Sequence, residues 1–162
     1  MTELSITVIG SGLMGHGIAY VFASSGHRVA IYDPDKNVLA STVSRISEIF
    51  SMLEQAPEGL DNIKTFDSLE KSAEQADVII EAAPEKLELK RELFDELIAS
   101  SPVNSILATN TSGIPIGEIA KHTLAPDRIV GTHFWNPPYL ILLVEVIQSQ
   151  YSNPEVVQRI MM

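Results

Sequence analysis

Two side chains in the second half of the chain could act together as a general base. His133 stands in the segment 131–137, and Glu145 interrupts the apolar run 141–147. A carboxyl group inside an apolar run predicts a buried carboxylate, which is costly unless a partner stabilises it. A histidine is a suitable partner, because a carboxylate on one ring nitrogen fixes the tautomer and raises the basicity of the other. The pattern therefore predicts a His133–Glu145 pair, with the hydroxyl of Ser112 at the end of a neighbouring strand.

Each of these residues also has a purely structural interpretation. His133 could be a core histidine that bonds to the backbone, and Glu145 could face solvent at a strand end. Ser112 could cap the helix that follows its turn. The segment 135–139 could form a turn, although we favour the edge of a substrate pocket.

The opening of the chain carries a second pattern that could do chemistry, the run Gly-Ser-Gly-Leu-Met-Gly at 10–15. Gly10 would make the tight turn from strand to helix, Gly12 would let the backbone approach a pyrophosphate, and Gly15 would let helix and strand pack closely. Free N–H groups at the start of the helix, at Leu13 and Met14, would then face the phosphates. This spacing predicts a dinucleotide-binding loop.

The surrounding sequence also fits a dinucleotide-binding unit. The alternative is a loop of a βαβ unit that binds no nucleotide. An apolar strand over 4–9 precedes the glycines, and apolar residues at helical spacing follow over 13–25. Gly26 stands where a glycine commonly ends a helix. The run 27–33 then predicts a second strand that ends in Asp33, where the ribose of a bound dinucleotide would lie.

Asp33 also predicts which cofactor is bound. A carboxylate there accepts hydrogen bonds from the ribose hydroxyls but repels a 2′-phosphate, and Pro34-Asp35-Lys36 offers no arginine to accommodate one. We therefore expect NAD and not NADP. Alternatively or in addition, Asp33 could cap the next helix.

The remaining histidines carry weaker signals. His16 lies in the first turn of the helix after the glycines, where it could touch a pyrophosphate or face solvent. We assign His27 and His122 to the surface.

The rest of the chain predicts strands alternating with helices, hence an α/β fold with a doubly wound, mostly parallel sheet of the Rossmann type. We expect this domain over 1–150 and, over 151–162, the start of a helix that leads to a domain absent from this chain. Further strands are expected at 63–66, 76–82, 105–109, 128–134 and 141–147, and helices at 35–55, 68–75, 85–100 and 116–121.

Composition excludes several other classes. With 162 residues and a net charge of −10, the chain has no basic stripe for nucleic acid or an anionic membrane. It has no cysteine, so we expect no disulfide and no metal site. The first strand starts almost at Met1 and no apolar stretch could span a bilayer, so we expect a cytoplasmic protein.

Taken together, these motifs resemble the L-3-hydroxyacyl-CoA dehydrogenases through their NAD-binding domain, over nearly the whole chain. The resemblance rests on the glycine-rich segment 10–19, Glu-Ala-Ala-Pro-Glu at 81–85 with Lys90, Asn-Thr-Ser at 110–112, His-Phe-Trp-Asn-Pro at 133–137 and Leu-Val-Glu-Val-Ile at 143–147.

The resemblance implies reversible, NAD-dependent oxidation of the 3-hydroxyl of a 3-hydroxyacyl-CoA. His133 would remove the hydroxyl proton while hydride passes to the nicotinamide, and Glu145 would orient and charge-stabilise His133. Ser112, Asn110 and Asn136 would contact the substrate.

On the cofactor side, Glu85 and Lys90 match family positions near the nicotinamide ribose, and Asn110 would also lie close to the cofactor. The family carries a second, helical domain that completes the cleft and forms a homodimer, and this chain lacks it. We therefore expect this chain to bind NAD but not to sustain turnover on its own. The segment 33–77 is also shorter than the family's helical hairpin, and it holds no lysine that we can match to the family's CoA contact.

Two alternatives follow. Relatives that oxidise carnitine or sugar acids share the His-x-x-Asn-Pro and Val-Glu patterns, so the substrate could be a small 3-hydroxy acid without CoA. The chain could also be a nonenzymatic NAD-binding module, although such a module has no need of a His133–Glu145 pair. Sugar-nucleotide dehydrogenases and methyltransferases share only the opening loop.

Overall fold

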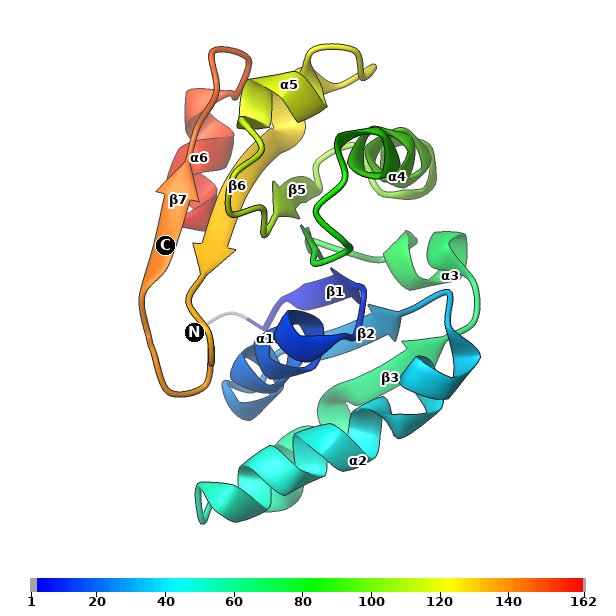
Figure 1. Cartoon of the computed structure of the whole chain (residues 1–162), viewed down its shortest axis with the longest axis vertical. Helices are drawn as coiled ribbons and strands as arrows, with labels where there is room; N and C mark the ends of the chain where they lie inside the picture. The colour runs from blue at the N-terminus through cyan, green and yellow to red at the C-terminus, as the bar shows by residue number, and fades with distance from the viewer. Residues whose placement is uncertain (1–2, 162) are drawn as a thin grey trace.

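The structure, a computed structural model that describes residues 3–161, is built on one seven-stranded sheet in the order β3-β2-β1-β4-β5-β6-β7 (Figure 1). All neighbouring strands are parallel except β6 and β7. The strands are β1 (Ser5–Ile9), β2 (Arg28–Tyr32), β3 (Ile63–Phe66), β4 (Val78–Glu81), β5 (Ile106–Thr109), β6 (Ile129–Phe134) and β7 (Val144–Ile147).

Helices cover both faces of the sheet, as a doubly wound fold requires. Side chains of α1, α2 and α6 share one apolar core, and side chains of α3, α4 and α5 share the other. The helices are α1 (Leu13–Ser24), α2 (Lys36–Met52), α3 (Leu69–Ala73), α4 (Leu87–Ser100), α5 (Ile116–Ala120) and α6 (Pro154–Ile160), with short 3-10 helices η1 (Pro57–Asn62) and η2 (Pro126–Arg128).

Alternation along the strands builds these two cores. In β1, Ile6 and Val8 point to the α1 side while Ile9 points to the α4 side, and all three are buried. This arrangement confirms the predicted α/β class and sheet type. A strand with both faces covered needs apolar residues on both, which is why β4 and β5 each begin with three consecutive apolar residues.

The predicted glycine turn after the first helix is present in full. Gly26 has φ +84°, the N–H of Gly26 donates to the carbonyl of Ala23, and the N–H of His27 donates to that of Phe22. These two bonds form a Schellman motif, which turns the chain directly into β2.

The last strand is shorter than expected, whereas the last helix begins where it was expected. The final strand begins at Val144 and not at 141, because Leu142 and its neighbours lie in an exposed connection. The helix α6, capped by Asn153 as expected, packs Val156 into the same core as α1. This helix is therefore in contact with the dinucleotide-binding fold.

None of the helices within residues 3–161 is long and apolar enough to cross a membrane.

Candidate active site

The carboxyl ends of the parallel strands gather the expected site residues at one edge of the sheet. The chain builds outward from β1 to β2 and β3, then returns to place β4 on the other side of β1. Ligands of doubly wound sheets bind in the crevice at such a reversal. The loops after β1, β4 and β5 and the end of β6 therefore lie at the edge of the sheet where a ligand is expected.

The loop after β1 has the shape that a dinucleotide needs. Gly10 has φ +89°, and a Cβ there would lie 2.8 Å from the carbonyl oxygen of Ala82. A Cβ on Gly15 would lie 1.7 Å from the carbonyl oxygen of Gly10, so helix and strand pack as closely as predicted. A Cβ on Gly12 would meet nothing within 4 Å, which leaves space for a ligand at the start of α1.

Asp33 stands at the end of β2 and holds the glycine loop. Its Oδ2 accepts from the N–H of Ser11 at 2.7 Å, and its Oδ1 accepts from the N–H of Asp35 at 2.9 Å. The alternative that Asp33 caps the next helix is wrong, because Asp35 is the N-cap of α2 and accepts from the N–H groups of Asn37 and Val38. Oδ2 also accepts from the Ser11 hydroxyl at 3.3 Å, so Oδ1 is the oxygen that retains a lone pair for a ribose hydroxyl.

His133 and Glu145 lie directly opposite each other in the antiparallel β6–β7 pair. Nδ1 of His133 is 2.7 Å from Oε2 of Glu145, which also accepts from the indole N–H of Trp135 at 3.2 Å. We assign the proton of the neutral ring to Nδ1, because a carboxylate is its neighbour. Nε2 of His133 then carries a free lone pair.

The expectation of a buried Glu145 is wrong. Its side chain is 48% exposed, because β7 is the edge strand of the sheet and most of its residues face solvent. Hydrogen bonds from His133 and then from Trp135 lower the pKa of Glu145. The carboxylate is stabilised by these donors at the surface and not by a buried partner.

Glu85 shapes the turn that carries Ser112. One of its oxygens accepts from the Thr111 hydroxyl and, at 3.0 Å each, from the N–H groups of Ser112 and Gly113. Ser112 itself is exposed and does not cap the following helix, whose N-cap is Pro115. The Ser112 hydroxyl is therefore presented at the end of β5, beside the end of β6 that carries the histidine.

A buried ion pair between Lys90 and Glu81, which sequence reasoning did not predict, lies next to Glu85. Nζ of Lys90 bonds to both oxygens of Glu81 at 2.7 and 2.8 Å, and the side chains are 1% and 0% exposed. Glu81 also accepts from the Thr109 hydroxyl at 2.6 Å and from the N–H of Ala83 at 2.6 Å. Lys90, expected among the cofactor contacts, is thus enclosed and lies 3.5 Å from Glu85.

Asn110 and Asn136, both expected to contact the substrate, differ in their hydrogen bonds and their exposure. The side-chain oxygen of Asn110 accepts from the N–H of Phe134 at 2.8 Å and so ties the end of β5 to the end of β6. Asn136 is exposed and precedes Pro137 through a cis peptide bond. The next residue, Pro138, packs against Gly17 of α1, where a Cβ would lie 2.7 Å from the proline ring.

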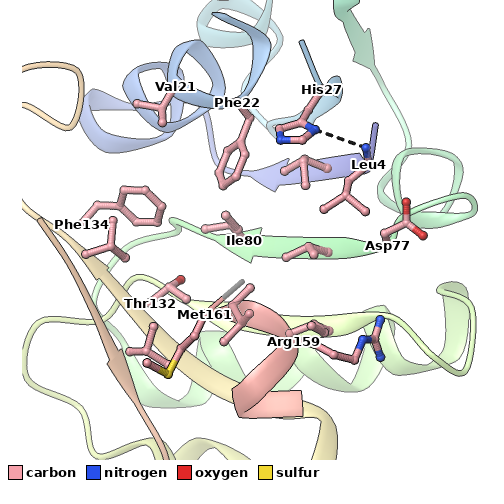
Figure 2. Close-up of a pocket in the computed structure, with 16 residues that line it drawn as sticks. Leu4, Val21, Phe22, His27, Asp77, Ile80, Thr132, Phe134, Arg159 and Met161 are labelled. Carbon is pink, nitrogen blue, oxygen red and sulfur yellow. Dashed lines mark hydrogen bonds between the residues drawn. The ribbon is translucent and has the colours of Figure 1, made fainter. Parts of the chain in front are cut away.

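An apolar cavity lies on the other face of the sheet from His133. It measures about 740 Å³ and lies between α1 and α6, among apolar side chains such as Phe22 and Phe134 (Figure 2). Thr132 and Phe134 line it, so the intervening His133 points to the other face of the sheet. His27 also lines this cavity and accepts from the N–H of Leu4 at 3.2 Å, so its predicted surface position is only partly correct.

We expect Glu85→Gln to lower stability in a pH-dependent way. Burial alone would raise the pKa of Glu85, but hydrogen bonds from Thr111, Gly113 and Ser112 and the charge of Lys90 outweigh it, and the pKa is lowered. The charged form therefore stabilises the folded state above the unfolded pKa of about 4.3, and this contribution is lost as pH falls through the lowered folded pKa.

Urea unfolding of the parent and of Glu85→Gln at pH 7 and pH 3 tests this expectation. The difference in unfolding free energy should be largest at pH 7 and shrink at pH 3, where the protonated acid resembles glutamine. A difference that stays constant with pH would contradict it. Glu88→Gln, on the exposed side of α4, is the matched control.

The comparisons with known proteins agree with this geometry. The family model for the 3-hydroxyacyl-CoA dehydrogenase NAD-binding domain matches residues 5–162. Mitochondrial hydroxyacyl-coenzyme A dehydrogenase of Rattus norvegicus is 38% identical over 161 residues, which cover 91% of this chain and 51% of the relative. The crystal structure of 3-hydroxybutyryl-CoA dehydrogenase from Escherichia coli superposes with a TM-score of 0.89 at 35% identity, over 98% of this chain and 35% of that one.

L-carnitine dehydrogenase of Streptomyces griseus is 35% identical over 156 residues, which cover 94% of this chain and 47% of the relative. The chain thus spans about half, or less, of the length of these relatives.

Proposed function

The chain belongs to the 3-hydroxyacyl-CoA dehydrogenase family through its NAD-binding domain, and we propose that it oxidises the 3-hydroxyl of a 3-hydroxyacyl-CoA with His133 as the general base. The observation that carries this proposal is the 2.7 Å contact between His133 and Glu145, at the same sheet edge as the glycine loop. A protein that only bound NAD would have no use for that pair.

The protonation state of His133 follows from its partner. The protonated Nδ1 of His133 donates a hydrogen bond to Glu145, so the unprotonated Nε2 can take the proton of a substrate hydroxyl. NAD, when bound, supplies the acceptor for the hydride that leaves C3. The substrate thus loses one proton and one hydride and becomes a ketone, and in the reverse direction His133 returns the proton as a general acid.

Glu145 suits the charge that develops on the ring. Because its pKa is lowered, it stays ionised at neutral pH and stabilises the imidazolium that forms when His133 takes the proton. Ser112 offers a free hydroxyl to the substrate oxygen, and Asn136 a free amide. In this proposal Asn110 acts by bonding to the backbone of Phe134, the residue that follows His133.

The residues around the glycine loop fit NAD. The open space at Gly12 suits a pyrophosphate, and the Asp33 carboxylate suits a ribose with a free 2′-hydroxyl. We propose that Glu85 lies near the nicotinamide ribose and that Lys90 acts through it.

Calorimetric titration of the chain with NADH and NADPH, with and without acetoacetyl-CoA, tests this function. We expect NADH to bind at least about tenfold more tightly than NADPH, because Asp33 repels a 2′-phosphate. Acetoacetyl-CoA should shift the NADH isotherm, and it should be reduced when the chain is joined to the helical domain of a relative. NADH binding without reduction, even in that joined protein, would favour the nonenzymatic module, and equal binding of NADPH would contradict the role of Asp33.

One observation favours a second candidate, a small 3-hydroxy acid without CoA. Between β2 and β3 the structure has the single helix α2 and the short η1, and not the helical hairpin expected of a CoA-binding relative. The similarity to L-carnitine dehydrogenase points the same way. Reduction of 3-dehydrocarnitine or acetoacetate in preference to acetoacetyl-CoA would establish this candidate.

A further inference from the structure

Two side chains, Arg45 and His16, bond to carbonyl oxygens of the glycine loop. Nη2 of Arg45, on α2, donates to the carbonyl oxygen of Ser11 at 2.8 Å. Nδ1 of His16, on α1, lies 2.6 Å from the carbonyl oxygen of Gly12, which also accepts from the backbone N–H of His16 at 3.3 Å. These contacts fix two consecutive peptide groups.

The fixed carbonyls determine where the neighbouring N–H groups point. In a trans peptide the C=O and the following N–H point in opposite directions. With the Ser11 and Gly12 carbonyls turned toward Arg45 and His16, the N–H groups of Gly12 and Leu13 point away from them. Neither N–H has a partner among residues 3–161, so both are available to a ligand at the start of α1.

The tautomer of His16 follows from the distance. A nitrogen 2.6 Å from a carbonyl oxygen must carry the proton between them, so Nδ1 is a donor. It cannot also accept from Nη1 of Arg45, although that atom is 3.3 Å away. Arg45 therefore acts through Nη2, which also reaches the carbonyl oxygen of Val38 and the hydroxyl of Thr42, each at 3.2 Å.

Ser11 is held at every polar group. Its N–H donates to Asp33, and its hydroxyl lies 2.9 Å from that of Thr42 and 3.3 Å from Oδ2 of Asp33. With the carbonyl on Arg45, the residue is completely buried. The loop is thus locked at one residue by β2 and α2 together.

Stability alone does not account for Arg45. Its acceptors are neutral oxygens, no ion pair within residues 3–161 includes it, and its Nε is buried without a partner. A half-buried guanidinium in that state costs desolvation energy that a neutral side chain would avoid. Unfavourable placements of this kind are commonly retained for function.

We propose that Arg45 and His16 are positioning residues, which hold the Gly12 and Leu13 peptide groups in the orientation that binds a pyrophosphate. The proposal rests on the NAD-binding function and adds the side chains that preorganise it. Neither residue needs to touch the cofactor, because their effect is transmitted through the loop backbone.

Comparison of ADP with adenosine separates this role from a general structural one. ADP carries the pyrophosphate and adenosine does not, while both use the ribose contact of Asp33. We expect Arg45→Met to raise the Kd for ADP about tenfold, the size of one lost charge-assisted contact, and to change the Kd for adenosine less than about twofold. Arg28→Met, which removes an exposed charge at the far end of β2, should change neither.

His16→Leu removes the side-chain contact with the Gly12 carbonyl and leaves α2 unchanged. It replaces Arg45→Met as the test if that variant fails to fold. It should weaken ADP about threefold to tenfold and spare adenosine. In the parent, NMR signals of the Gly12 and Leu13 amides should shift with ADP and not with adenosine.

Equal weakening of both ligands, or of neither, would overturn the proposal. Full ADP affinity in Arg45→Lys would also overturn it, because lysine keeps the charge but lacks the fork that reaches Ser11. Failure of the parent chain to bind ADP would instead contradict dinucleotide binding itself, and with it the role of the loop.

Discussion

His133→Gln, measured in a version of the protein that carries the family's helical domain, is expected to lower kcat for NADH-dependent reduction of acetoacetyl-CoA by about 10²- to 10⁴-fold, the usual contribution of a positioned general acid or base. Glutamine keeps a polar side chain of similar length, and its amide can still donate to Glu145. It cannot give up or take a proton near neutral pH. The loss should therefore appear in kcat, while the Kd for NADH stays within about twofold of the parent value.

The position of His133 makes this separation of kcat from cofactor affinity possible. The histidine lies on β6, whereas the glycine loop follows β1, and β4 and β5 stand between them in the sheet. His122→Gln, at an exposed position after α5, is the matched control and should leave kcat unchanged. Turnover of His133→Gln at the parent rate would remove the general-base assignment, and so would an equal loss in the control.

Glu145→Gln refines the same assignment. The amide of glutamine still lies next to Nδ1 of His133 but carries no negative charge. In the parent, the hydrogen bond with His133 lowers the pKa of Glu145 and so favours the charged carboxylate. The rate of proton transfer should fall less than in His133→Gln, because the ring itself remains. The pH dependence of kcat/KM should shift as well, which a purely structural role of Glu145 would not produce.

The order of strands and helices was predictable because it depends on local periodicity. The strand at 63–66 and the glycine turn at Gly26 needed no knowledge of distant residues. The position of each strand in the sheet, central or at the edge, was not predictable in the same way, and this position decides how buried its side chains are. Reasoning from one acid in an apolar run predicted burial for Glu145, which lies on the edge strand, and the same reasoning applied to 78–81 would have found Glu81.

The alternative caps at Asp33 and Ser112 are wrong for a related reason, whereas the caps expected at Gly26 and Asn153 are confirmed. Asp33 and Asp35 are both acids before a helix, and only the geometry shows that Asp35 caps α2 while Asp33 turns to Ser11. The contact between Arg45 and Ser11 joins residues that only the packing of α2 brings together. Single-sequence patterns carry no signal for such a contact, because neither residue type nor spacing distinguishes it.

Lys90→Met is expected to destabilise the fold by about 3–5 kcal/mol, the usual cost of leaving one partner of a buried ion pair without the other. Glu81 would remain in the middle of the sheet, completely enclosed, with its charge opposed only by the Thr109 hydroxyl and the N–H of Ala83. Typical domains are stable by only about 5–15 kcal/mol, so much of the stability should be lost. Urea unfolding at pH 7 measures the change.

The double variant Glu81→Gln with Lys90→Met separates the cost of the unpaired charge from the loss of packing. Glutamine can accept from the N–H of Ala83 and donate to the hydroxyl of Thr109, so the pair is removed without leaving a charge. We expect the double variant to recover most of the stability that Lys90→Met loses. Lys86→Met, at the exposed start of α4, should be nearly neutral.

The double variant also decides how Lys90 serves the site. If the ammonium acts only by holding Glu81 and the loop that carries Glu85, the refolded double variant should bind NADH with nearly the parent affinity. A large loss of NADH affinity with stability restored would mean that the charge itself reaches the cofactor. In that case Glu85 would have to move away from Lys90 when the cofactor binds, so that the ammonium group could reach it.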